Sequence, residues 1–95
     1  MSNTYYVTIG NSDDKLTQQR WARYCHTVVD LCEEYADEIH VVGFTTTDSQ
    51  WQTMIVACVL ADEEAAQLKD ALLLVRAEFD QDSIAFAKTT EVEFL

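Results

Sequence analysis

The chain has 95 residues, of which 48% are hydrophobic and 11% aromatic, which excludes a disordered acidic tail and predicts one small globular domain over residues 1–95. Seventeen Asp and Glu residues against six Lys and Arg give a formal net charge of −11, which disfavours direct binding to nucleic acids or anionic membranes and favours basic protein surfaces. The three cysteines form no C-x-x-C pair, and we find no leader or membrane-spanning apolar run, so we expect a cytoplasmic protein with reduced thiols.

The first two predicted elements are a strand and a helix. Residues 4–10, TYYVTIG, are rich in β-branched and aromatic side chains and end at a glycine, which predicts the strand. The helix is predicted from about Thr17, its N-cap, to Tyr35, because apolar side chains recur every three or four residues. This apolar stripe consists of Trp21, Tyr24, Cys25, Val28, Cys32 and Tyr35. We therefore expect Trp21 and the two thiols of the stripe in the core.

Two further strands are predicted over residues 39–46 and 51–60, joined by a polar hairpin. The segment 51–60 is apolar in both phases, which is typical of a strand inside a sheet. Asp62 is the predicted cap of a second helix, whose apolar stripe is Ala65, Leu68, Leu72, Val75 and Phe79. In the last segment, one parity carries Ile84, Phe86, Val92 and Phe94, so one continuous strand is predicted.

The order strand, helix, strand, strand, helix, strand predicts an α+β, ferredoxin-like split βαβ fold, although a different strand order competes with it. Its antiparallel four-stranded sheet would carry both helices on one face. The other face would be bare, which predicts a homodimer that buries it. The strands offer Tyr5 or Tyr6, Phe44, Met54, Val56 and their alternating partners, which are more apolar side chains than one helix-covered face should need.

In such a fold, the loops at residues 10–16, 47–51 and 80–83 meet at one end of the sheet. Acidic and aromatic side chains in these loops are candidate contacts for a partner: Asp13, Asp14, Asp48, Trp51, Asp80 and Asp82. A second acidic cluster consists of Glu33, Glu34, Asp37 and Glu38. Trp51 is either a contact anchor or a cap on the edge of the core.

The segment GNSDDK at residues 10–15 allows several chemical interpretations. Its single glycine and adjacent carboxylates oppose a phosphate cradle. Oxygen atoms of Asp13, Asp14 and Asp82 suit Mg²⁺ or Ca²⁺, but the spacing is not that of an EF-hand, and adjacent Asp residues in a loop are more often a solvated helix start than a metal site. Cys25 and His26 would point about 100° apart on a helix, so they form no nucleophile–base pair. We therefore predict no enzyme and no cofactor.

Four short motifs carry a resemblance to a known group of proteins. They are IGNSDDKLTQ followed by Trp21, WQ at 51–52, QDSIA, and TEVEF. Together they resemble small accessory proteins of bacteriophages and related mobile elements over most of the chain. The resemblance implies a phage or plasmid accessory gene and transfers no catalytic residue. Small acidic phage proteins often resemble inhibitors of host defence systems, which implies an anti-CRISPR or anti-restriction role.

The leading functional hypothesis is therefore a non-enzymatic inhibitor that binds a basic, nucleic-acid-binding protein of a host defence complex. An alternative is an oligomeric ferredoxin-like module that binds a nucleotide or a divalent metal through the loops at one end of the sheet. A third hypothesis is a metal-dependent nuclease or other hydrolase, which requires the loop aspartates to hold Mg²⁺.

Overall fold

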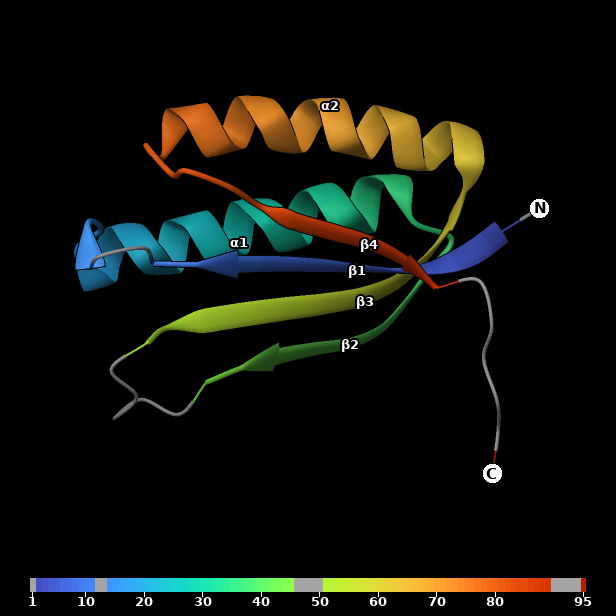
Figure 1. Ribbon diagram of the computed structural model, residues 1–95, viewed down its shortest axis with the longest axis horizontal. Coiled ribbons are helices and arrows are strands. Elements are labelled where there is room, and N and C mark those ends of the chain that lie inside the picture. Colours follow the sequence, from blue (N-terminus) through green and yellow to red (C-terminus); the bar gives the residue numbers. More distant parts are fainter. Residues whose placement is uncertain (1, 12–13, 46–50, 90–94) are drawn as a thin grey trace.

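The computed structural model describes residues 2–11, 14–45, 51–89 and 95. Along the chain, the elements are β1 (Ser2–Gly10), α1 (Gln18–Tyr35), β2 (Glu38–Phe44), β3 (Thr53–Ala61), α2 (Asp62–Glu78) and β4 (Ala85–Thr89), as Figure 1 shows. This confirms the predicted order, with most boundaries shifted by one or two residues. The predicted continuation of the last strand beyond Thr89 falls largely on residues 90–94, which lie outside the described residues.

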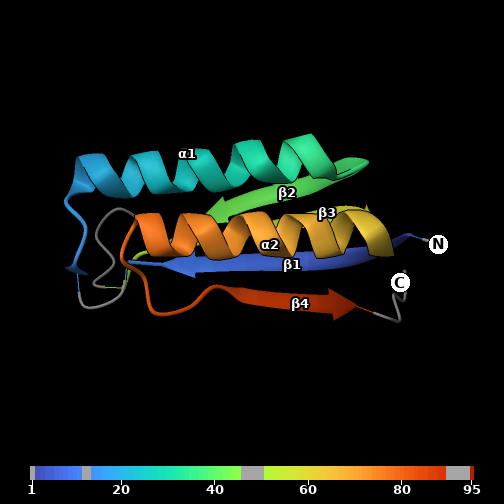
Figure 2. The same cartoon turned by 90° about the horizontal axis from the view of Figure 1, so that it is seen from above.

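The four strands form one antiparallel sheet in the order β2-β3-β1-β4. The two long strands β1 and β3 pair along their whole length, from Ser2 opposite Ala61 to Gly10 opposite Thr53. Figures 1 and 2 show both helices on the same side of this sheet. The fold is therefore the predicted ferredoxin-like arrangement, and β3 lies inside the sheet because its side chains are apolar in both phases.

Helix α1 begins and ends as its sequence predicts. The Thr17 hydroxyl accepts a hydrogen bond from the Arg20 backbone N–H at 3.2 Å, so Thr17 is the N-cap. The predicted stripe is buried from Trp21 to Cys32 and faces the sheet. After the helix, the Asp37 N–H donates to the Val59 carbonyl oxygen at 2.9 Å, and this bond directs the chain into β2.

Helix α2 begins one residue earlier than a cap at Asp62 would place it, because Ala61 is the N-cap. The prediction for Asp62 is therefore wrong. Its carboxylate instead accepts hydrogen bonds from the Lys88 ammonium at 3.3 Å and the Tyr5 hydroxyl at 3.2 Å. Lys88, followed by Tyr5, holds the pKa of Asp62 below its usual range. Asp62 thus ties the start of α2 to β1 and β4.

The turn after α2 is a Schellman motif. The Asp80 N–H donates to the Ala77 carbonyl oxygen at 3.2 Å, and the Gln81 N–H donates to that of Arg76 at 3.0 Å. Asp80 has a φ of 55°, a left-handed conformation that is more often occupied by glycine or asparagine. The chain therefore stops this helix without a glycine, and Asp80 has a structural role in the turn.

Tyr24 lies at the centre of the core between the helices and the sheet. It is fully buried and stacks on Phe79, with ring centroids 4.9 Å apart. Its hydroxyl has no hydrogen-bond partner among the described residues. Burial raises the pKa of Tyr24 to about 12, and the charge of Arg76 partly offsets this rise.

We predict that Tyr24→Phe raises the free energy of unfolding by about 1 kcal/mol, because it removes a buried hydroxyl that lacks a hydrogen bond while keeping the stacked ring. Urea unfolding of the variant and the unchanged protein measures the difference. Tyr35→Phe is the control, since Tyr35 is only partly buried and should change little. A loss of stability in Tyr24→Phe would contradict the prediction.

The alternation of β1 decides which side chains face the helices. Tyr5 is buried on the helix side, in the more apolar phase of the strand, and Tyr6 faces the open side. Met54 and Val56 of β3 are also buried under the helices. Of the two tyrosines, Tyr6 therefore belongs to the open face, and Tyr5, Met54 and Val56 belong to the face that the helices cover. Phe44 pairs with Met54, so it too lies on the helix side, where it lines a groove beside α1.

The open face nevertheless has an apolar surface. Pairing and alternation place the following residues on it: Tyr6, Val41, Ile55, Ala57, Val59, Ala85 and Ala87. Val41 is 54% exposed, and Tyr6 and Ile55 are each 38% exposed. Among the described strand residues, Glu38 at the rim is the one charged residue on this face. In a chain with a net charge of −11, this is a surface of unusually low charge.

Candidate functional site

The loop between β1 and α1 is organised by the side chain of Asn11. Its Oδ1 accepts a hydrogen bond from the Leu16 N–H at 2.9 Å, and its Nδ2 donates to the Leu16 carbonyl oxygen at 3.0 Å. The same Nδ2 donates to Gln52 Oε1 at 3.0 Å, which joins this loop to the start of β3. Asn11 is buried, so its hydrogen bonds stabilise the loop from inside and it is not part of a contact surface.

The candidate contact Asp14 lies in the same loop as Asn11. It is exposed and has a φ of 53°. Its backbone N–H donates to the Asn11 carbonyl oxygen at 3.2 Å, and Asn11 Nδ2 lies 3.4 Å from its carboxylate. Asp14 is therefore a turn residue of the folded loop. The two other candidates Asp13 and Asp48 lie outside the described residues.

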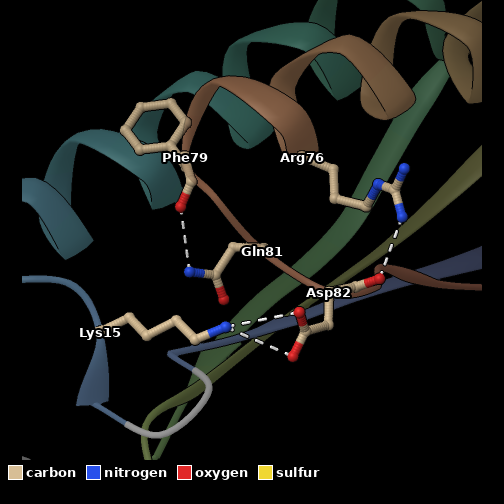
Figure 3. A network of polar contacts seen from close by, with 5 residues as sticks. All are labelled: Lys15, Arg76, Phe79, Gln81 and Asp82. Atoms are coloured by element: carbon tan, nitrogen blue, oxygen red, sulfur yellow. Dashed lines mark hydrogen bonds and ion pairs between the residues drawn. The ribbon is translucent and has the colours of Figure 1, made fainter.

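The candidate contacts Asp80 and Asp82 lie at the same end of the sheet as Asp14, which we call the loop end. Each faces a basic side chain: Lys15 Nζ lies 3.4 Å from the Asp82 carboxylate, and Arg20 Nη1 lies 3.9 Å from that of Asp80. Figure 3 shows the Lys15–Asp82 pair, with Arg76 donating to the Asp82 carbonyl oxygen at 3.0 Å. Three of the six basic residues of the chain thus lie at this end, which reduces its acidic character.

Trp51 lies two residues before the start of β3 at Thr53, and it is 68% exposed. This exposure excludes its interpretation as a cap on the core, whereas Trp21 is buried as predicted. Next to Trp51, the side chains of Gln52 and Gln18 exchange hydrogen bonds of 2.7 and 3.0 Å. Trp51 is therefore presented beside a fixed polar pair, and its role as a contact anchor stays a prediction.

The second acidic cluster lies at the opposite end of the sheet. Glu33 and Glu34 are in the last turn of α1, and Asp37 and Glu38 lead into β2. Helix α2 starts at the same end, at the right in Figure 1, with three further acidic residues. We call these seven residues the acidic end: Glu33, Glu34, Asp37, Glu38, Asp62, Glu63 and Glu64. The sequence analysis did not include the three residues of α2 in this cluster, and it considered Asp62 only as the cap of the second helix.

The basic side chains near the acidic end are few. Lys88 pairs with Asp62, and His40 lies 4.0 Å from Glu38. In the described part of the chain, no Lys or Arg forms an ion pair with Glu33, Glu34 or Asp37. The acidic end is therefore a largely uncompensated negative surface, in contrast to the loop end.

Among the residues that the structure describes, the thiols and histidines show no nucleophile–base pair. Burial raises the pKa of Cys25 to about 11, and the adjacent His26 instead pairs with Asp30 at 3.4 Å. A hydrogen bond with Cys58, together with burial, raises the pKa of Cys32. Within the described ranges, no group of three or more His, Cys, Asp or Glu side chains could hold a metal ion, and no helix is long and apolar enough to cross a membrane.

No protein-family model matches the chain, and no curated protein matches it significantly. Among solved structures, it is similar to the de novo designed protein Foldit4, with a TM-score of 0.71 and 12% identity over 97% of this chain and 100% of that one. It is also similar to a dimeric ferredoxin-like protein of unknown function from Thermobifida fusca, with a TM-score of 0.61 and 10% identity over 93% and 90%.

A third similar structure is the periplasmic divalent cation tolerance protein CutA from Archaeoglobus fulgidus, with a TM-score of 0.49 and 13% identity over 100% of this chain and 88% of that one. This likeness is too distant to carry an argument about metal or function. At these identities, the comparisons show the fold alone. The chain has a ferredoxin-like fold.

Proposed function

We propose that this protein is a non-enzymatic binding protein whose acidic end docks onto a basic surface of a partner protein. The observation that carries the proposal is the set of exposed carboxylates Glu33, Glu34, Asp37 and Glu38, which form no ion pair with a Lys or Arg within the described structure. A compact surface of one sign attracts a surface of the opposite sign at long range and speeds association. The unpaired carboxylates are thus available to a partner.

The local energetics of α1 favour a role in binding over a role in stability. Glu33 and Glu34 lie in the last turn of α1, where the helix dipole is negative and where no basic residue is present. A carboxylate at that position costs a few tenths of a kcal/mol, whereas the acidic residues at the start of α2 stabilise their helix. Glu33 and Glu34 therefore slightly destabilise the end of α1, and their presence is not explained by the stability of the fold.

The resemblance to phage accessory proteins makes a host defence protein the first partner to test. Nucleic-acid-binding effectors carry basic channels, and a small folded polyanion suits such a channel. The proposed contacts are the carboxylates at the end of α1 and the start of β2, which belong to Glu33, Glu34, Asp37 and Glu38. Asp14, Asp80, Asp82 and Trp51 at the loop end form the competing contact surface.

The test compares two variants that remove negative charge from opposite ends. One carries Glu33→Gln, Glu34→Gln, Asp37→Asn and Glu38→Gln, and the other carries Asp14→Asn, Asp80→Asn and Asp82→Asn. A partner is captured from host lysate, purified, and titrated with each variant over a salt series. We expect the first variant to lose about 2 kcal/mol of binding, roughly thirtyfold in Kd, and the unchanged protein to bind more weakly as salt rises.

The same experiment has clear negative outcomes. Affinity that does not respond to salt, or a greater loss in the loop-end variant, would contradict the proposal. The first variant should also unfold at an equal or higher urea concentration, because it relieves repulsion at the end of α1. A loss of binding caused by unfolding is thereby distinguished from the loss of a contact.

We also propose that the protein acts as a homodimer through the open face of the sheet. Support comes from the apolar side chains on that face and from its near lack of charge, since two chains of net charge −11 repel each other through their other surfaces. Face-to-face packing would leave both helices, and both acidic ends, directed outward. The similar protein from Thermobifida fusca is described as dimeric, which is consistent with this proposal.

A further inference from the structure

A groove of about 160 Å³ lies on the helix side of the sheet, between α2 and β4. Its walls are apolar and come from Leu72 of α2 and from Ile84 and Phe86 on the β4 side. Two of the six basic residues of the chain, Lys69 and Arg76, also line it, and among the described residues no carboxylate belongs to its lining. In so acidic a protein, this combination of apolar wall and positive rim is distinctive.

Arg76 brings a positive charge to this groove. Its Nη1 donates to the Asp82 carbonyl oxygen at 3.0 Å, as Figure 3 shows, while its Nε is buried and has no partner among the described residues. The turn after α2 thus holds the guanidinium of Arg76 at the groove that this residue lines, and its positive charge attracts an acceptor bound there.

Neither Asp82 nor the carboxylates at the start of α2 oppose an anion at Arg76. Figure 3 shows the Asp82 carboxylate directed toward Lys15, which neutralises it at 3.4 Å. The carboxylates at the start of α2 are distant: Glu64 and Arg76 are twelve residues apart on one helix, which is about 18 Å. This separation exceeds the Debye length of about 8 Å at physiological ionic strength, so the acidic end is largely screened there.

We propose that the groove between α2 and β4 binds a small organic carboxylate with an apolar body of about one aromatic ring. The carboxylate would accept a charge-assisted hydrogen bond from Arg76 and face Lys69, and the ring would lie against Leu72, Ile84 and Phe86. Its size suits this ligand class, since a cavity of about 150 Å³ accommodates a benzene ring. This site is separate from the acidic end and from the open face, so it does not depend on either proposal above.

Benzoate is the probe that tests the site, and benzyl alcohol is its uncharged counterpart. Amide NMR spectra of ¹⁵N-labelled protein are recorded during titration with each compound. We expect benzoate to shift the signals of Ser83, Ile84 and Phe86 in a saturable manner, with at least tenfold weaker binding of benzyl alcohol. Arg76→Gln should weaken benzoate binding at least tenfold, and Lys69→Gln should weaken it severalfold.

Arg23→Gln is the matched control, because Arg23 is exposed on α1 and lies outside the groove. It removes the same charge and should leave benzoate binding unchanged. Lys69→Gln keeps the test valid if Arg76→Gln fails to fold, since Lys69 is exposed and its loss leaves the turn after α2 intact. Equal binding of benzyl alcohol, equal weakening by Arg23→Gln, or no saturable shift in the groove would overturn the proposal.

Discussion

Asn11→Ala is expected to lower the free energy of unfolding by about 2–3 kcal/mol. The substitution removes one acceptor and two donors from a buried loop, and it leaves both the N–H and the carbonyl oxygen of Leu16 without their partner. Leu16 is itself buried, so water cannot simply replace the lost bonds. Urea unfolding followed by circular dichroism measures the change.

The matched control for this prediction is Asp14→Asn in the same loop. Asp14 is exposed, and asparagine tolerates the positive φ at this position, so the expected loss is below about 1 kcal/mol. If Asp14→Asn instead destabilised the protein as much as Asn11→Ala, the Asp14 carboxylate would have a structural role that its exposure does not suggest. A large loss in Asn11→Ala and a small loss in Asp14→Asn would show that the Asn11 side-chain amide stabilises the loop between β1 and α1.

Ile55→Lys is expected to convert the proposed homodimer to a monomer without unfolding it. Ile55 lies on the open face and is 38% exposed, so a lysine there can reach water in the free protomer. In a dimer with two-fold symmetry, the substitution would bury two unpaired charges in the interface. The dissociation constant of the dimer should rise at least about a hundredfold, which corresponds to about 2.7 kcal/mol.

Light scattering at high micromolar concentration distinguishes the two states. Leu74→Lys is the control, because Leu74 is 76% exposed on α2 and the change alters the net charge by the same amount. Lysine also lowers the overall negative charge, which by itself would favour association, so a monomeric Ile55→Lys is explained only by the face it occupies. A monomeric unchanged protein, or an Ile55→Lys variant that remains dimeric, would reject the open face as the interface.

Much of the fold follows from short-range patterns in the sequence. The spacing of three and four residues from Trp21 to Cys32 predicts α1, and Thr17 predicts its first hydrogen bond. The apolar segment of β3 predicts its central position in the sheet. These predictions succeed because helical and strand periodicity depend on neighbours within a few residues, and burial of the apolar phase then determines the packing.

The candidate sites were less predictable, because they depend on how distant side chains meet. The grouping of Asp14, Asp80 and Asp82 at one end follows from the alternation of strands, but their neutralisation does not. Lys15 reaches Asp82 only because its long side chain points toward that residue. The direction depends on the conformation of the loop between β1 and α1, which the hydrogen bonds of Asn11 stabilise. The left-handed turn at Asp80 could not be predicted either, because the sequence has no glycine at this position to indicate it.

The helices and strands, their order and the sign of the net charge follow from the amino-acid sequence, since each depends on residue type and local spacing. The place where the charge is uncompensated follows from the three-dimensional fold, because compensation requires that a basic and an acidic side chain from different elements approach within about 4 Å. Lys15 and Arg20 meet the loop-end carboxylates in this way, and Lys88 meets Asp62. Glu33 and Glu34 meet no Lys or Arg within the described ranges, and the docking of α1 and α2 on one sheet is what places them beside the acidic start of α2.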